Sequence, residues 1–223
     1  MLLKRFIIGL SATLALAAPA SAATLVNGSF NGTLGQGVVP TGWQITNQTP
    51  DTNNVNTNSI GVGGGNYFTA PNDSNDGGTW VGIAYTSTTG EFETIGQTIS
   101  DFVVGQTYTL GFEFGNFGIA NAFNFNNSNS VTASLDGVVI GTTADVFVLS
   151  PEWNTYSVDF VAASTSALLG FSLTKDFRSY LQIDGVTLTT AGTTIQPVPL
   201  PGGLIFMLTA LGGLTFVRRR SQG

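Results

Sequence analysis

The chain has 223 residues and a formal net charge of −6 at neutral pH. It contains no cysteine and no histidine, which excludes disulfides, Ser-His-Asp and Cys-His nucleophile systems, and zinc sites built on Cys or His ligands. All 13 acidic residues but only two of the seven basic ones, Lys175 and Arg178, lie between residues 23 and 196. This body therefore has a formal charge of −11, which makes a nucleic acid partner improbable.

The first 22 residues are typical of a secretory signal peptide. Lys4 and Arg5 precede an apolar run over residues 6–18, and Ala20-Ser21-Ala22 forms a small-residue cleavage site. Cleavage after Ala22 would leave residues 23–196 as one domain with a sizeable core. An N-terminal membrane anchor is the alternative, but the apolar run is short for one.

The body shows apolar and polar residues in alternation, with a period of two. The alternation predicts strands around residues 107–114, 131–135, 155–160 and 168–173, and Asp136-Gly137 predicts a two-residue hairpin turn. Half-polar strands of this kind favour antiparallel sheets, whose apolar faces are buried when two sheets stack or one closes into a barrel. We therefore predict an all-β fold, an antiparallel β-sandwich of jelly-roll type.

Two positions interrupt this simple pattern. Along residues 181–188 the apolar phase slips by one at Asp184-Gly185, which a β-bulge explains better than a second hairpin. Gln97 shares a strand face with Ile95 and Ile99, and a buried glutamine there is expected to be a structural hydrogen-bond hub.

Residues 47–65 and 116–130 are rich in asparagine, glycine and polar residues and are expected to form loops. The second loop also contains three phenylalanines. It would cover a sheet edge, line a groove, or form a weakly ordered insertion.

The last part of the chain is a short apolar segment bounded by prolines and arginines. As a helix, residues 202–217 would span about 24 Å, against a hydrocarbon core of about 30 Å, and four glycines weaken the helix further. The arginines at 218, 219 and 220 would stay on the cytoplasmic side. The segment is therefore expected to be a poor permanent anchor.

This arrangement resembles the PEP-CTERM class of sorting signals, in the VPLPA-type variant. The residues that carry the resemblance are Val198, Pro199, Leu200, Pro201, Arg218, Arg219 and Arg220. The resemblance implies a Gram-negative bacterium, a sorting signal over residues 197–223, and an inner-membrane-tethered intermediate with transient anchoring by the C-terminal helix. An exosortase would then release the body to the cell surface or extracellular matrix. An ordinary single-pass anchor is the alternative.

The body resembles galactose-binding-like jelly rolls, relatives of carbohydrate-binding modules. The motifs that carry this resemblance are LVNGSF (25–30), PTGW (40–43), IGQTIS (95–100), GQTYTLGFEFGN (105–116), LDG (135–137) and LQIDGVTL (181–188). Such jelly rolls often hold a structural calcium ion between their first and last strands. The resemblance places this candidate site at Asn27, Asn31 and Asp184, with Asp184 acting alternatively as the cap of the bulge.

Extracellular polysaccharide is the partner that both resemblances imply. Sugar recognition needs an exposed aromatic surface and polar groups for the hydroxyls. The candidates are Tyr67, Trp80, Tyr85, Asn116, Trp153 and Arg178, although core packing is the more common role for any one aromatic residue, and Trp43 is expected in the core.

Catalysis would need two carboxylates about 5 to 10 Å apart. Glu91 and Glu93 would share a strand face at roughly 7 Å, but on a polar face a solvated role is the default expectation. We therefore expect a non-catalytic secreted protein associated with polysaccharide. The alternatives are a matrix or adhesion protein acting through protein contacts, and a polysaccharide-processing enzyme.

Overall fold

The structure, a computed structural model, describes residues 23–56, 66–86, 92–120, 124–148 and 152–191. The predicted signal peptide and the predicted sorting tail lie outside these ranges. The chain divides into two units at Thr189 and Thr190, and almost all of what is described belongs to the first. In the part of the chain that the structure describes, no helix is long and apolar enough to cross a membrane.

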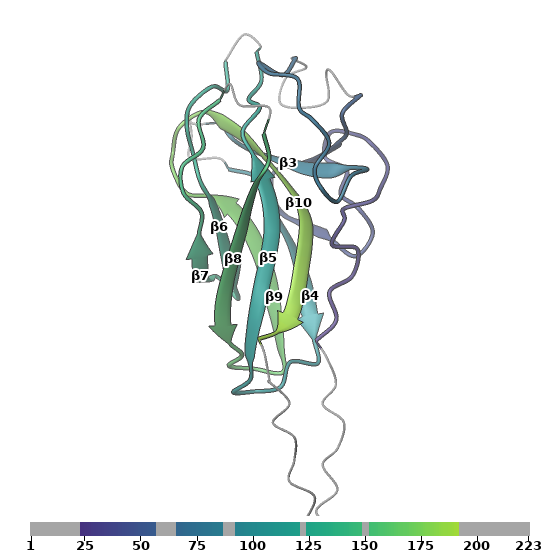
Figure 1. The fold of residues 1–223 in the computed structure, drawn as a ribbon, viewed down its shortest axis with the longest axis vertical. Helices are drawn as coiled ribbons and strands as arrows, with labels where there is room; N and C mark the ends of the chain where they lie inside the picture. Colours follow the sequence, from purple (N-terminus) through teal and green to yellow (C-terminus); the bar gives the residue numbers. More distant parts are fainter. Residues whose placement is uncertain (1–22, 57–65, 87–91, 121–123, 149–151, 192–223) are drawn as a thin grey trace, which may run out of the picture. The chain divides into compact units, whose positions relative to one another are not determined.

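The described residues form two five-stranded sheets, in the orders β1-β4-β9-β6-β7 and β2-β3-β10-β5-β8, that face each other (Figure 1). The strand pairs whose register is resolved are all antiparallel. The predicted all-β antiparallel sandwich is confirmed. The strands are β1 (Gln44–Asn47), β2 (Asp51–Asn53), β3 (Trp80–Tyr85), β4 (Thr94–Ser100), β5 (Thr107–Gly115), β6 (Val131–Leu135), β7 (Val138–Thr142), β8 (Asn154–Val161), β9 (Ser166–Leu173) and β10 (Ser179–Thr190).

The main core lies between the two sheets, and the alternation in the sequence locates it correctly. In β5 the apolar residues at 108, 110, 112 and 114 are all at most 4% exposed. In β9 the corresponding residues are Ala167, Leu169, Phe171 and Leu173. Phe112 and Phe171 meet across the sandwich with ring centroids 5.1 Å apart, so aromatic packing joins the two sheets. Trp43 is buried in the same cluster, as expected.

The turn and the phase slip read from the sequence are both present. Asp136 and Gly137 join β6 to β7 with φ values of 48° and 79°, the pair of positive values that a type I′ hairpin turn requires. β10 runs unbroken through Gly185, whose φ is 56°. Val186, after Gly185, lies in the same core cluster as Ile183, before it. A continuous strand with a bulge therefore replaces the alternative of a second hairpin.

Gln97 is a structural hub, as predicted. Its side chain is 3% exposed, accepts a hydrogen bond from the Val26 amide and donates one to the Val26 carbonyl, both at 2.7 Å. The pair of bonds ties the N-terminal segment of the body to β4.

The second sheet has a covered outer face, which the sequence did not predict. Phe117, Ile119 and Phe125, from the expected loop 116–130, are at most 1% exposed and form a second cluster with Ala84 and Tyr180. The described part of this loop is therefore packed on the face of the β2-β3-β10-β5-β8 sheet. Trp153 closes the layer, with its ring edge against Phe117 and Trp80 at 5.2 and 5.4 Å.

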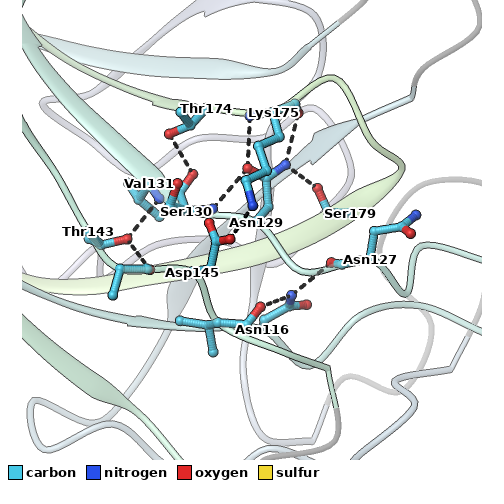
Figure 2. Close-up of polar contacts among 12 residues, drawn as sticks. Asn116, Asn127, Asn129, Ser130, Val131, Thr143, Asp145, Thr174, Lys175 and Ser179 are labelled. Atoms are coloured by element: carbon cyan, nitrogen blue, oxygen red, sulfur yellow. Dashed lines mark hydrogen bonds and ion pairs between the residues drawn. The ribbon is translucent and has the colours of Figure 1, made fainter.

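Asn129 joins three segments that are far apart in the sequence (Figure 2). Its amide nitrogen donates to the Lys175 carbonyl at 2.9 Å and to the Ser179 hydroxyl at 2.7 Å. Its amide oxygen accepts from the backbone N–H groups of Ser130 and Lys175, both at 2.9 Å. Its own backbone pairs with Val146. All of its hydrogen-bonding capacity is therefore used within the protein.

Candidate functional site

The outer face of the β1-β4-β9-β6-β7 sheet carries a groove of about 390 Å³. Five strands contribute to it or border it, and most of the side chains that point into it are small and carry hydroxyl groups. The residues that line the groove are Thr46, Phe92, Thr94, Thr132, Ser134, Gly137, Val139, Leu168, Gly170, Phe171 and Ser172.

A row of hydroxyl side chains crosses the sheet at right angles to the strands. The Thr46 and Thr94 hydroxyls are hydrogen-bonded to each other. Ile95 pairs with Phe171, so Thr94 stands opposite Ser172, which pairs in turn with Thr132. The Thr132 hydroxyl lies 3.2 Å from that of Thr142, its partner on β7. Each strand thus contributes one hydroxyl-bearing residue to the row. Some of the hydroxyls bond one another, and Thr132 also bonds Thr174 at 2.7 Å, but a hydroxyl has one donor and two acceptor lone pairs, so capacity for a ligand remains.

Next to this row, Gly170 lowers the surface of the sheet. It pairs with Gly96 on one side and with Ser134 on the other. Because Gly170 has no side chain, its backbone lines the groove beside Leu168, whereas Gly96 is buried next to the side chains of Thr46 and Leu168. None of the lining residues is charged, so the groove can bind a neutral polar molecule but has no ion to pair with an anion.

One end of the groove is aromatic. Phe92 lines it and is 37% exposed, and its ring stacks on Tyr85 with the planes 6° apart and the centroids separated by 6.1 Å. The Asn47 amide nitrogen donates to the Phe92 carbonyl at 2.7 Å. Contacts from both sheets therefore hold Phe92, one to its backbone and one to its ring. Sequence analysis missed Phe92, because an aromatic residue beside a strand of unknown register carries no signal of the surface it faces.

Of the six residues predicted to bind glycan, only Tyr85 is next to the groove. Trp80 and Asn116 are fully buried, so the expectation that they face a ligand is wrong. Asn116 donates to the carbonyls of Asn127 and Val146. Trp153 packs in the covering layer and donates its indole N–H to the Asn72 carbonyl at 2.8 Å.

The other two predicted residues also lie away from the groove. Tyr67 packs edge-on against Phe117 in the covering layer. Arg178 donates from Nε to the Thr86 carbonyl at 3.2 Å. The structure therefore does not bring the predicted glycan residues together.

The predicted calcium ligands are likewise engaged elsewhere. The Asn27 side chain closes its own turn: it donates to the Asn31 and Thr41 carbonyls and accepts from the Asn31 amide. Asp184 accepts from the Ser74 hydroxyl and from the Gly185 amide at 2.8 Å, the latter as expected of a cap for the bulge. Among the described residues no group of three or more His, Cys, Asp or Glu side chains could hold a metal ion. A calcium ion takes six to eight oxygen ligands, backbone carbonyls included, and the site at Asn27, Asn31 and Asp184 stays a prediction.

Four carboxyl groups are buried under the covered face of the second sheet, and one of them is Glu93, for which a solvated role was expected. Asp51, Glu93, Glu113 and Asp184 are at most 7% exposed. Burial raises the pKa of Asp51 to about 6, that of Asp184 to about 7 and that of Glu93 to about 9. Glu91, the other half of the predicted catalytic pair, lies outside the described residues.

A second recess, of about 410 Å³, lies on the opposite sheet beside Asp76 and Glu113. It is also lined by Phe112 and Tyr156, which pack against each other at 5.3 Å as part of the main core and its margin. It thus combines acidic side chains with the partly buried Tyr156 ring. The groove on the other sheet differs in having no charged lining residue and Phe92 at one end.

No protein-family model and no curated protein matches the chain. Among solved structures, one match is the C-terminal family 22 carbohydrate-binding module of a Clostridium thermocellum xylanase. The alignment covers 77% of this chain and 98% of that module, with 16% sequence identity and a TM-score of 0.44. A family 4 carbohydrate-binding module matches 75% of this chain and 100% of its own, with 15% identity and a TM-score of 0.43. A Clostridium thermocellum xylanase fragment containing a CBM22 and a GH10 module, solved with xylohexaose, matches 69% of this chain and 27% of its own, with 20% identity and a TM-score of 0.41.

The chain spans less than two thirds of the length of several solved proteins that it matches, namely 64%, 27% and 20% of three of them. The TM-scores are below 0.5 and the identities below 25%, so they do not assign the chain to a family. The structures that resemble it include carbohydrate-binding modules.

Proposed function

We propose that the chain is an exported, non-catalytic protein that binds a neutral glycan in the groove on the β1-β4-β9-β6-β7 sheet. The observation that carries this proposal is the row of hydroxyl side chains across all five strands, with Gly170 beside it and Phe92 at one end. Hydroxyl groups can exchange donor and acceptor roles with sugar hydroxyls. The Phe92 ring supplies an apolar surface for the C–H face of a sugar ring.

The direction of the row favours an extended chain of sugars over a single one. Neighbouring strands lie about 4.8 Å apart, a spacing close to the length of one sugar in an extended β-1,4-linked chain. In a glycan lying along the row, successive sugars would thus contact the hydroxyl-bearing residues of successive strands. The groove has no charged lining residue and the body is strongly acidic, so a neutral polymer is favoured over an anionic one.

Phe92→Ala is expected to weaken binding of a neutral oligosaccharide about tenfold, since 1.4 kcal/mol of lost contact changes a dissociation constant by that factor. Thr132→Val, which keeps the shape and removes the hydroxyl, is expected to weaken it several-fold. Isothermal titration calorimetry of the chain with xylohexaose and other neutral oligosaccharides measures both effects.

Two surface variants serve as matched controls. Phe147 is 74% exposed and does not line the groove, and Ser157 lies on β8 in the other sheet. Phe147→Ala and Ser157→Ala should leave affinity unchanged. Equal losses in the groove and control variants would contradict the assignment of the site.

Delivery by the PEP-CTERM-type tail is part of the same proposal. The apolar segment is short for a bilayer and rich in glycine, so we expect it to be removed by an exosortase-type enzyme, which would release the body to the cell surface or matrix. Mass spectrometry of the protein recovered from its native cells should find a C-terminus upstream of residue 218. An intact chain ending at Gly223 and retained in the inner membrane would show that the segment is a permanent anchor.

A further inference from the structure

Glu93 is a buried carboxyl group placed between two residues of the groove. Phe92 and Thr94 line the groove on either side of it along the chain, whereas the Glu93 side chain points inward and is 3% exposed. A change in the position of Glu93 would therefore move the backbone of Phe92 and Thr94, two residues that line the groove.

Glu93 connects the two sheets through two hydrogen bonds to Ala84, which we call the Ala84 clamp. The backbone N–H of Glu93 donates to the Ala84 carbonyl at 2.9 Å, and the carboxyl Oε2 of Glu93 accepts from the Ala84 N–H at 2.7 Å. Ala84 belongs to β3 in the second sheet, while Glu93 immediately precedes β4 in the first. Tyr85, next to Ala84, stacks on Phe92. The Ala84 clamp therefore keeps the rings of Tyr85 and Phe92 stacked at this end of the groove.

The groups that face Glu93 are acidic or neutral. Asp51 of β2 lies near it, as does Tyr180 of β10, whose hydroxyl donates to Asp51 at 2.9 Å. Tyr67 lies in the same layer and interacts with both Asp51 and Tyr180. The Thr49 hydroxyl donates to Glu93 Oε1 at 3.4 Å. Arg178 is the nearby cation whose contact is known, and its Nε donates to the Thr86 carbonyl at 3.2 Å.

We propose that Glu93 is a positioning residue: its neutral carboxyl group holds Phe92 and Thr94 in the binding geometry, and its ionisation loosens that end of the groove and weakens glycan binding. This inference rests on the proposed function of the groove. It adds that binding is switched by alkaline pH through a residue that does not touch the ligand.

The direction of the pH effect follows from the environment of the group. Burial, and then the charge of Asp51, raise the pKa of Glu93 to about 9. The carboxyl group is consequently neutral at pH 7 and becomes charged as the pH passes 9, with Asp51 as the charged group that acts on it among the described residues. Above that pH a linked binding equilibrium can change by up to about tenfold per pH unit.

The carboxyl group can be observed without any ligand, because the sequence contains only four glutamates. In the full-length chain labelled with ¹³C-glutamate, the carboxyl signal that disappears in Glu93→Gln belongs to Glu93. We expect it to titrate near pH 9, and the amide signals of Phe92 and Thr94 to shift with the same midpoint. A Glu93 signal that titrates below pH 7, or amides that ignore its titration, would overturn the inference.

Binding supplies the second measurement. Affinity for xylohexaose should fall by about tenfold between pH 7 and pH 10. Glu93→Gln keeps an acceptor for the Ala84 N–H and stays uncharged, so it should bind as the wild type does at pH 7 and lose the pH dependence. Asp51→Asn removes a charge that raises the pKa of Glu93, so its midpoint should move to lower pH.

Failure of the two proposals can be told apart. If no neutral oligosaccharide binds at any pH, the proposed function is wrong, while the coupled titration of Glu93, Phe92 and Thr94 still decides whether the clamp exists. If the wild type binds equally at pH 7 and pH 10, or if Glu93→Gln has the same pH profile as the wild type, the positioning role is wrong.

Discussion

Asn129→Ala should be among the most destabilising single substitutions in the described body, with a loss of about 4 kcal/mol or more in the free energy of unfolding. The substitution removes four side-chain hydrogen bonds that join the segments before β6 and after β9 (Figure 2). Asn129 is fully buried, so water cannot replace these bonds without opening the structure. The backbone N–H groups of Ser130 and Lys175 would lose the acceptor they share.

Two further variants make this prediction specific. Asn129→Asp has nearly the same shape, but it sets a carboxyl oxygen against the Lys175 carbonyl where an N–H donor was, so we expect a loss of similar size. Asn127→Ala is the control: Asn127 is exposed and donates from its side chain to the Arg178 carbonyl. It should cost about 1 kcal/mol or less. Urea unfolding curves of the full chain give each value, and equal losses for Asn127→Ala and Asn129→Ala would refute the role of Asn129 as a hub.

The second large effect is a fall in stability as the pH rises. Burial is the main cause that raises the folded-state pKa values of Asp51, Asp184 and Glu93, to about 6, about 7 and about 9. In the unfolded chain all three groups titrate near pH 4. Between pH 4 and these folded values the folded protein holds more protons than the unfolded one, so stability falls with rising pH. The contribution is fully present below about pH 4 and lost above about pH 9.

Its size follows from the shifts. Each pKa unit corresponds to about 1.4 kcal/mol, so Asp51 alone accounts for about 3 kcal/mol. Glu93 adds to this in the same direction and extends the fall to higher pH. Thermal unfolding of the full chain at pH values from 4 to 10 should show a steady decrease in melting temperature.

The double variant Asp51→Asn, Glu93→Gln tests the cause of this decrease. Both replacements are neutral at every pH and keep acceptor oxygens for the backbone N–H groups of Gly37 and Ala84. The variant should lose less stability between pH 5 and pH 9 than the wild type, and the remaining decrease should come from Asp184. An unchanged slope would mean that other groups produce the pH dependence.

The sequence predicted the layers of the sandwich better than it predicted its surfaces. Alternation in β5 and β9 identified which residues share a face, because a strand has a fixed period of two. The Asp136-Gly137 turn and the slip at Gly185 were also readable, since each requires a positive φ that few residues adopt. These features depend on neighbouring residues in the chain alone.

The groove and the buried acids depend on long-range pairing, which no local pattern reports. Thr94 and Ser172 form one row only because β4 lies beside β9. Glu113 lies on the polar side of β5, yet it is 7% exposed because the Asn75-Asp76 segment covers it with hydrogen bonds. The polar face of a strand has the same alternating sequence whether another segment of the chain covers it or water does. The sequence therefore carried no sign that these acids would be buried.

The most direct test of the groove is a map of amide chemical-shift changes in the ¹⁵N-labelled full chain when xylohexaose or another neutral oligosaccharide is added. We expect the changes to cluster at Phe92, Thr94, Thr132, Gly170 and Ser172, along the hydroxyl row. Changes confined to the other sheet, around Gly111 and Thr187, would contradict the assignment of this groove. An absence of changes with every neutral glycan tried would contradict glycan binding itself.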